Sequence, residues 1–140
     1  MKPRYMLDTN ICLYIGKHHP PEVKNRFERL KPGQVVISAI TYGELHYGAS
    51  KSTQRAKALM QLVALVQDIP VEGLGAHVAE AYGEIRAALE KQGRPIGNND
   101  LPNNDLWIGA HARAAGLILA TNNEREFKRI PGLAVENWTN

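Results

Sequence analysis

The sequence is poor in cysteine and in long apolar segments. Its single cysteine, Cys12, has no second thiol in the chain to pair with, so an internal disulfide is excluded. It lies in the apolar run Ile11–Leu13, as a small core residue does. No run of roughly 18 apolar residues is present, which argues against a membrane span. The N-terminal residues also lack the apolar stretch of a secretion signal. These absences predict a protein of the reducing cytoplasm that does not associate with a membrane.

The composition that is present suits one domain with a sizeable core. The chain has 140 residues, 44% of them apolar, with no domain-scale repeat and no low-complexity linker. We therefore expect a single domain over residues 1–140. The net charge of +3 and the pI of about 9.1 favour a polyanionic partner, although solvated helix faces explain many such charges. The basic residues gather in two stretches, Lys24–Lys31 and Arg86–Arg94.

Apolar segments of strand length alternate with segments of helical periodicity. Val35–Ile37 is a β-branched triplet that follows Pro32-Gly33, which is typical of a buried strand. The expected strands are Arg4–Asp8, Val35–Ile37, Leu117–Ala120 and Leu133–Glu136. The expected helices are Ile11–Lys17, Glu22–Leu30, Thr41–Ser50, Ser52–Asp68, Gly75–Gln92 and Leu106–Ala115. This alternation predicts an α/β fold with a mostly parallel central sheet flanked by helices on both faces.

Three acidic residues lie far apart in the chain, each where a strand is followed by a helix. Asp8 closes the first strand, while Glu44 and Asp105 stand near the start of helices. In parallel sheets, ligand sites form at the carboxyl ends of the strands, so these side chains can converge there. Clustered carboxylates provide the oxygen ligands that Mg²⁺ prefers, and a magnesium site in a basic protein suggests phosphodiester chemistry.

Each acid also has a structural interpretation. Asp8 is a good N-cap for the helix at Ile11, although Asn10 is an equally good cap. Thr41 and Glu44 match a capping box, in which the two side chains cap one helix end reciprocally. Asp105 can satisfy the free amides at the start of its helix. Pattern alone leaves these interpretations open.

A short motif is duplicated around the third acid. Asn98-Asn99-Asp100-Leu101 is repeated as Asn103-Asn104-Asp105-Leu106, so Asp100 competes with Asp105 for the site. We assign the site to Asp105, because it leads directly into the apolar helix, whereas Pro102 disfavours helical geometry at Leu101. His111 in that helix is most simply a core or dimer-contact residue.

Taken together, the motifs resemble the PIN-domain ribonucleases, and most closely the VapC toxins of bacterial toxin–antitoxin operons. The resemblance spans essentially the whole chain. It rests on Met6-Leu7-Asp8-Thr9-Asn10-Ile11, on Ile37–Leu45 with Gly48, on Gly93–Gly97 with Asn104–Ala112, and on Thr121–Phe127 with Ile130–Leu133. In this sequence Gly97 and Asp105 are separated by an insertion, and Asn123 stands where many members carry a fourth acid.

The resemblance implies a PIN-like fold and an endoribonuclease dependent on Mg²⁺, for which Mn²⁺ can substitute. Asp8, Glu44 and Asp105 would be catalytic and hold the ion directly or through water, with Asp100 the weaker candidate ligand. Thr9, Asn10 and Thr121 would orient carboxylates or waters. Asn123 or Glu126 would complete the site.

The resemblance also implies that the substrate is a structured RNA such as tRNA, and that its cleavage inhibits translation and growth. It implies a cognate VapB-type antitoxin, a homodimer and a larger toxin–antitoxin complex. The apolar faces of Leu59–Val66 and Val78–Leu89 suggest the dimer contact. Two other functions stay open: a nucleic-acid-binding module with a degenerate acid site, and a metal-dependent phosphatase. Phosphatases with an aspartyl nucleophile carry a second acid where Asn10 stands here, which disfavours that hypothesis.

Overall fold

The computed structural model describes residues 2–93 and 103–140, and within them the strands form one all-parallel sheet with the order β3-β2-β1-β4-β5. The strands are β1 (Tyr5–Leu7), β2 (Val35–Ser38), β3 (Val71–Glu72), β4 (Ile118–Thr121) and β5 (Val135–Asn137). The helices are α1 (Thr9–Lys17), α2 (Pro21–Glu28), α3 (Ala39–Ser50), α4 (Arg55–Asp68), α5 (Ala76–Lys91), α6 (Asn103–Ala114) and α7 (Glu124–Phe127). Met6 of the central strand pairs with Val36 on one side and Leu119 on the other.

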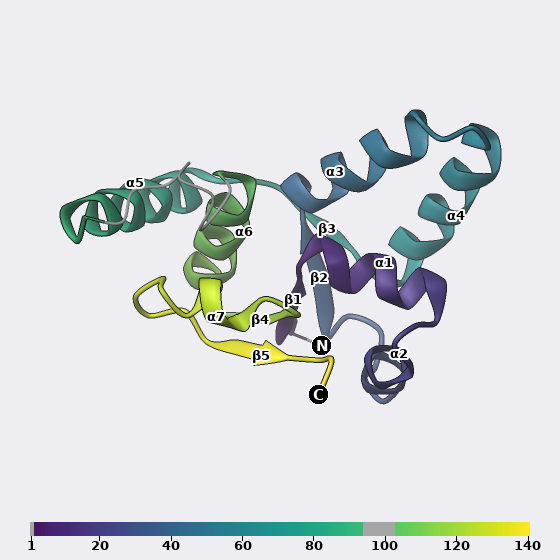
Figure 1. The fold of residues 1–140 in the computed structure, drawn as a ribbon, viewed down its shortest axis with the longest axis horizontal. Helices are drawn as coiled ribbons and strands as arrows, with labels where there is room; N and C mark the ends of the chain where they lie inside the picture. The colour runs from purple at the N-terminus through teal and green to yellow at the C-terminus, as the bar shows by residue number, and fades with distance from the viewer. Residues whose placement is uncertain (1, 94–102) are drawn as a thin grey trace.

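Helices cover both faces of the sheet, as expected (Figure 1). Side chains alternate along a strand, so Met6 packs with α5 and α6, whereas Tyr5 and Leu7 pack with α1, α2 and α4. Both faces are therefore apolar, which explains why the strands read as continuous hydrophobic runs. Because β1 and β2 are parallel neighbours, the strand ends that follow Leu7 and Ser38 lie at the same edge of the sheet.

Two predicted helix starts lie two residues too late in the sequence. α1 begins at Thr9 rather than Ile11, and α3 begins at Ala39 rather than Thr41. Both helices start immediately after the strand because Asp8 and Ser38 act as N-caps at the strand end. The short elements β3 and α7 were not predicted, and the last strand lies two residues later than Leu133 suggested, at Val135–Asn137. Residues 98–102, including Asp100 and Pro102, lie outside the described residues.

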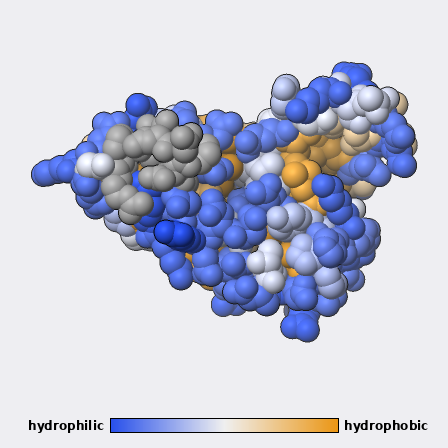
Figure 2. All heavy atoms as spheres, in the orientation of Figure 1, coloured by the Kyte–Doolittle hydropathy of each residue, from blue (hydrophilic) through white to orange (hydrophobic). Residues whose placement is uncertain are grey.

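The helices α3 and α4 form an arm that projects from the body of the protein (Figure 1). Figure 2 shows apolar surface in the hollow between this arm and the rest of the molecule. Large apolar side chains exposed on α1, α3 and α4 are Leu13, Tyr47, Met60 and Val63. In contrast, the apolar face of α5 is buried in the core, so only α4 leaves part of its predicted face free.

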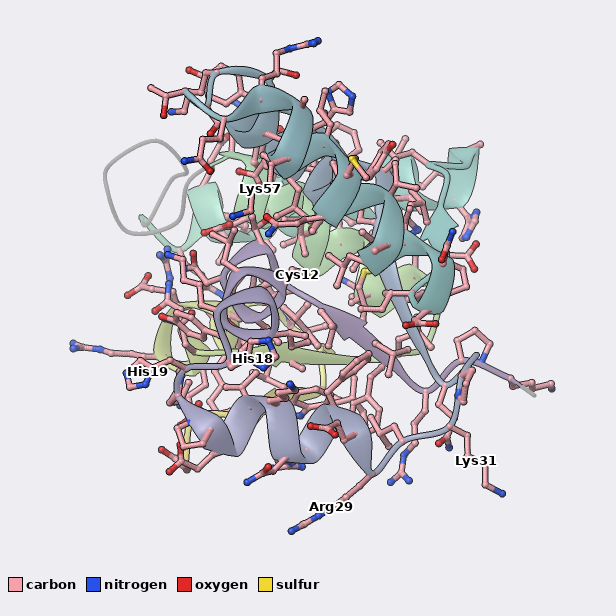
Figure 3. The ribbon with its side chains drawn as sticks, turned by 90° about the vertical axis from the view of Figure 1, so that its right-hand side faces the viewer. Cys12, His18, His19, Arg29, Lys31 and Lys57 are labelled. Atoms are coloured by element: carbon pink, nitrogen blue, oxygen red, sulfur yellow. The ribbon has the colours of Figure 1, made fainter. Side chains whose placement is uncertain are left out.

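The single cysteine and several side chains at the ends of α1 and α2 can be located in the structure (Figure 3). Cys12 is buried in the core, as predicted, and burial raises the pKa of its thiol. His18 and His19 are exposed at the end of α1, and Arg29 and Lys31 point away from the body (Figure 3). No helix in the described part of the chain combines the length and the hydropathy needed to cross a bilayer.

Candidate active site

The three predicted acids meet in one cleft of about 520 Å³ at the carboxyl ends of the strands. Asp8 enters it from the end of β1, Glu44 from α3 and Asp105 from the first turn of α6. The predicted neighbours Thr9, Asn10 and Asn123 also line the cleft. Three side chains that were not predicted complete the wall, namely Asn103, Asn104 and Phe127.

Asp8 is both a helix cap and a site residue, because its two oxygens have different partners. One oxygen, Oδ1, accepts a hydrogen bond from the Ile11 amide at 2.9 Å, and Oδ2 accepts one from the Thr121 hydroxyl. Burial raises the pKa of Asp8, the bonds from Thr121 and Ile11 oppose this, and the charge of Glu44 raises it further. The capping interpretation is therefore correct for this residue and does not exclude a role in the cleft.

Glu44 is not part of a capping box. α3 is capped by Ser38, whose hydroxyl oxygen accepts from the Ile40 amide at 3.1 Å, so Glu44 lies inside the helix rather than at its first turn. Its carboxylate faces the cleft instead. The Thr9 hydroxyl donates to Oε1 at 2.5 Å, and the Asn104 amide donates to Oε2 at 3.5 Å. The Thr9 hydroxyl therefore fixes the direction of the Glu44 carboxylate.

The ionised form of Asp105 is disfavoured in the cleft. Its pKa is raised to about 6, first by burial and then by the negative charges of Asp8 and Glu44. Like charges held close together in a partly buried site raise each other's pKa in this way. The cleft thus concentrates negative charge that a bound cation relieves.

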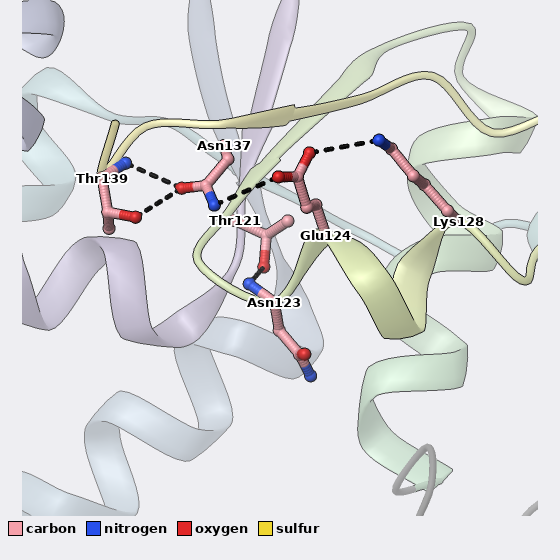
Figure 4. Close-up of polar contacts among 6 residues, drawn as sticks. All are labelled: Thr121, Asn123, Glu124, Lys128, Asn137 and Thr139. Atoms are coloured by element: carbon pink, nitrogen blue, oxygen red, sulfur yellow. Dashed lines mark hydrogen bonds and ion pairs between the residues drawn. The ribbon is translucent and has the colours of Figure 1, made fainter.

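The fourth position of the cleft is occupied by an amide. Asn123 lines the cleft, and its backbone amide donates to the Thr121 hydroxyl oxygen at 2.9 Å. Figure 4 shows its side chain pointing away from Glu124, which contacts Lys128 and Asn137 instead. Glu126 does not reach the cleft, because its carboxylate pairs with Arg129 at 3.1 Å.

Two other predicted residues are tied to the site by hydrogen bonds. Thr121 holds Asp8, as described above, and Asn10 donates from its amide to Asn122 Oδ1 at 3.5 Å. Asn122 in turn donates to the Tyr14 hydroxyl at 3.0 Å. Asn104 was not predicted, although its position directly before Asp105 at the start of a helix was a usable signal.

His111 lies away from the cleft, in the core between α6 and the end of β2. Its Nδ1 is 2.9 Å from the Ser38 hydroxyl oxygen, and burial lowers its pKa. Ser38 also accepts from the Ile40 amide, so its hydroxyl connects His111 to the start of α3. His111 is therefore a core histidine, the simpler of the two interpretations of its sequence position.

The donor set of the cleft suits a hard divalent cation. Carboxylates, amides and hydroxyls line it, and no lysine, arginine or histidine is among the described lining residues. No three His, Cys, Asp or Glu side chains within residues 2–93 and 103–140 form a ready-made cluster around one point. Mg²⁺ does not need such a cluster, because it commonly takes one or two carboxylates and keeps several waters.

Comparison with known proteins identifies the family of this chain. The PIN domain model matches residues 5–133. The tRNA(fMet)-specific endonuclease VapC of Shigella flexneri is 43% identical, with 97% of this chain and 98% of the relative covered. Ribonuclease VapC2 of Rickettsia felis is also 43% identical, covering 96% of this chain and 97% of the relative.

Solved structures agree with this assignment. The structure of DNA-bound VapBC from Salmonella typhimurium superimposes with a TM-score of 0.86 at 38% identity, covering 97% of this chain and 98% of the other. VapBC2 from Rickettsia felis, bound to a promoter DNA fragment, gives a TM-score of 0.83 at 40% identity, covering 96% and 98%. The chain therefore belongs to the PIN-domain family and, within it, to the VapC ribonucleases.

Proposed function

We propose that this protein is the endoribonuclease toxin of a VapBC-type pair and that it hydrolyses phosphodiester bonds in RNA with Mg²⁺. The observation that carries the proposal is the meeting of Asp8, Glu44 and Asp105 in one oxygen-lined cleft of a VapC ribonuclease. The relative from Shigella flexneri is named a tRNA(fMet)-specific endonuclease, so a tRNA is the substrate class that we propose here. Cleavage of a tRNA in the cytoplasm would inhibit translation and growth.

A cation is needed for RNA to enter this cleft. The described lining contains three acids and no basic side chain, so it repels a phosphodiester backbone. PIN-domain ribonucleases are metal-dependent in general, and we assign Mg²⁺ to this chain because every lining donor is a hard oxygen or an amide. Mn²⁺ has similar ligand preferences and would substitute.

Some side chains of the cleft would bind the ion, and others orient the carboxylates that bind it. Asp8 and Asp105 would hold the ion, with Glu44 acting directly or through water. A divalent ion at this position supplies Lewis-acid stabilisation of phosphate charge and acidifies a nearby water. Thr9 and Asn104 fix the direction of the Glu44 carboxylate, and Thr121 fixes that of Asp8. These bonds keep three mutually repelling carboxylates directed into one space.

We propose a VapB-type antitoxin as the protein partner. The solved relatives from Salmonella typhimurium and Rickettsia felis are VapBC complexes. The exposed Tyr47, Met60 and Val63 of the α3–α4 arm support further protein contacts, including a homodimer and a larger complex with the antitoxin. Light scattering at tens of micromolar tests the dimer, since weak dimers form in about that range. A monomer at that concentration argues against it.

The nuclease assignment is tested with purified protein and a transcribed tRNA. We expect cleavage with Mg²⁺ or Mn²⁺, none in EDTA, and products with 5′-phosphate and 3′-hydroxyl ends. Glu44→Gln is the matched control, because it keeps an acceptor for Thr9 while removing the charge. A variant that cleaves like the wild type limits Glu44 to a structural role.

The same experiment separates the two other functions. A small phosphate ester assayed beside the tRNA identifies a phosphatase if the ester alone is hydrolysed. RNA binding without cleavage, unchanged by Glu44→Gln, identifies a binding module with a degenerate acid site.

A further inference from the structure

One wall of the cleft is connected to α5 by a chain of hydrogen bonds that the metal chemistry does not use. The Tyr82 hydroxyl donates to Asn103 Oδ1 at 2.6 Å, and Arg86 Nη1 donates to the Tyr82 oxygen at 3.0 Å. Arg86 is also paired with Glu90 at 3.1 Å. The Tyr82 ring is stacked on Trp107 of α6, with centroids 3.8 Å apart and planes 8° from parallel. Asn103 is therefore hydrogen-bonded to Tyr82, whose ring is fixed in turn by its stack on Trp107.

Each hydrogen bond in this series has a defined donor and a defined acceptor. A guanidinium group can only donate, so the Tyr82 oxygen accepts from Arg86 and the single Tyr82 proton goes to Asn103. The bond from Tyr82 turns the oxygen of the Asn103 amide toward α5 and occupies one of its two lone pairs. The NH₂ group of Asn103 is the end of the amide left to face the cleft, and it carries two donor protons.

Asn103 therefore offers hydrogen-bond donors to the cleft, whereas most of the cleft wall offers acceptors. The three acids of the cleft wall, Asp8, Glu44 and Asp105, present acceptors. The neighbouring Asn104 already donates from its NH₂ group to Glu44. Asn123 also lines the cleft, but no side-chain hydrogen bond in the described region fixes which end of its amide faces inward. Asn103 is thus a donor of fixed orientation beside an acidic site.

From this arrangement we propose that Asn103 binds a phosphate oxygen of the RNA backbone next to the scissile phosphate, and that Tyr82 and Arg86 are positioning residues for it. Asparagine amides are common partners of phosphate and sugar oxygens, and a neutral donor binds an anion without competing for the metal. The inference rests on the proposed nuclease function, since it names how the substrate of that same cleft is held.

Three variants distinguish RNA binding by Asn103 from a purely structural role, in which these hydrogen bonds only attach α6 to α5. Asn103→Asp keeps an acceptor for Tyr82 but replaces the donor with a negative charge. Tyr82→Phe keeps the stack on Trp107 but removes the hydroxyl that orients the amide. Asn25→Asp is the matched charge control, because Asn25 is exposed on α2 and does not line the cleft.

The measurement is tRNA cleavage at saturating Mg²⁺, with KM and kcat determined separately and the Mg²⁺ midpoint recorded for each variant. For Asn103→Asp we expect KM to rise by roughly tenfold or more with kcat less affected, since a hydrogen bond to a charged group is lost. Tyr82→Phe is expected to raise KM by a smaller factor, with the Mg²⁺ midpoint unchanged, and Asn25→Asp to match the wild type.

Two results would overturn the inference and can be told apart. The first is a wild type that cleaves while Asn103→Asp and Tyr82→Phe keep its KM. The hydrogen bonds between Arg86, Tyr82 and Asn103 then only attach α6 to α5, and the proposed function stands. If the wild type neither binds nor cleaves RNA, the proposed function fails and this inference fails with it. Thermal melting of each variant confirms that a raised KM comes from folded protein.

Discussion

The metal-free protein is expected to become more stable when Asp105 is replaced by asparagine, even though the variant should be inactive. Burial and the charges of Asp8 and Glu44 raise the pKa of Asp105 from 3.8 to about 6, so its ionised form is disfavoured in the folded state. Asparagine has nearly the same shape and carries no charge. The substitution therefore removes a repulsion that the active site maintains in the absence of a cation.

The magnitude follows from the pKa of Asp105. Raising a pKa from 3.8 to about 6 corresponds to roughly 3 kcal/mol at neutral pH. Asp105 is only half-buried, so solvent screening reduces this to about 1–2 kcal/mol. The lost carboxylate also favoured the N-terminal end of α6, which costs the variant about 0.3–1 kcal/mol. We expect a net gain of about 1 kcal/mol for Asp105→Asn at pH 7.5.

The gain should depend on pH with a defined sign. The folded state binds the Asp105 proton more tightly than the unfolded state, so the penalty in the wild type is full above pH 6. It is relieved as the pH falls through about 6 and is gone near the unfolded value of 3.8. The advantage of the variant should shrink over the same range.

Urea unfolding in EDTA at several pH values measures this difference. Repeating it with saturating Mg²⁺ should reverse the order, because a bound ion stabilises the wild type more than a variant lacking one ligand. An Asp105→Asn protein that is no more stable than the wild type in EDTA at pH 7.5, or an advantage that grows as the pH falls, would refute the reasoning.

Three further predictions concern residues around the site. Gly109→Ala should lower the free energy of unfolding by about 1–2 kcal/mol in a urea titration, because its Cβ would lie 2.4 Å from Ile130 Cδ1 in a buried contact; an unchanged midpoint would mean that this contact relaxes freely. Thr121→Val removes the donor that favours ionised Asp8, so the acidic limb of the pH profile of kcat/KM should move to higher pH; an unmoved limb would show that Asp8 does not control it. Cys12 is buried and burial raises its thiol pKa, so it should react with a thiol reagent in urea but not in the native protein, and rapid native labelling would contradict its placement.

The sequence predicts the sheet better than the helix starts, for a physical reason. Runs such as Val35–Ile37 are buried on both faces, so their apolar character does not depend on register. The start of α3 is different, because Ser38 and Thr41 are both good caps by residue type. Only the course of the chain after β2 decides between them. The edge strand β3 is two residues long and exposed, which leaves no hydrophobic pattern to detect.

The site shows the same division between local and distant information. The strand-end position of Asp8 is local, and the motif around it was sufficient to predict it. The contacts of Glu44 with Thr9 and Asn104 join segments far apart in the sequence, and no pattern encodes their geometry. Glu126 illustrates the opposite case: it lies near Asn123 in the sequence, yet its pairing with Arg129 turns it away from the cleft.

We propose that the carboxylates of Asp8, Glu44 and Asp105 hold the catalytic ion, directly or through water. Crystals soaked in Mn²⁺ test it most directly, because the anomalous signal of manganese locates the ion without assumptions about activity. We expect one strong peak within coordination distance of Asp8 and Asp105, with Glu44 bound directly or through water, and we expect the peak to be lost in Asp105→Asn. A peak bound by Asp100 in place of Asp105, or no peak in the cleft at saturating Mn²⁺, would contradict it.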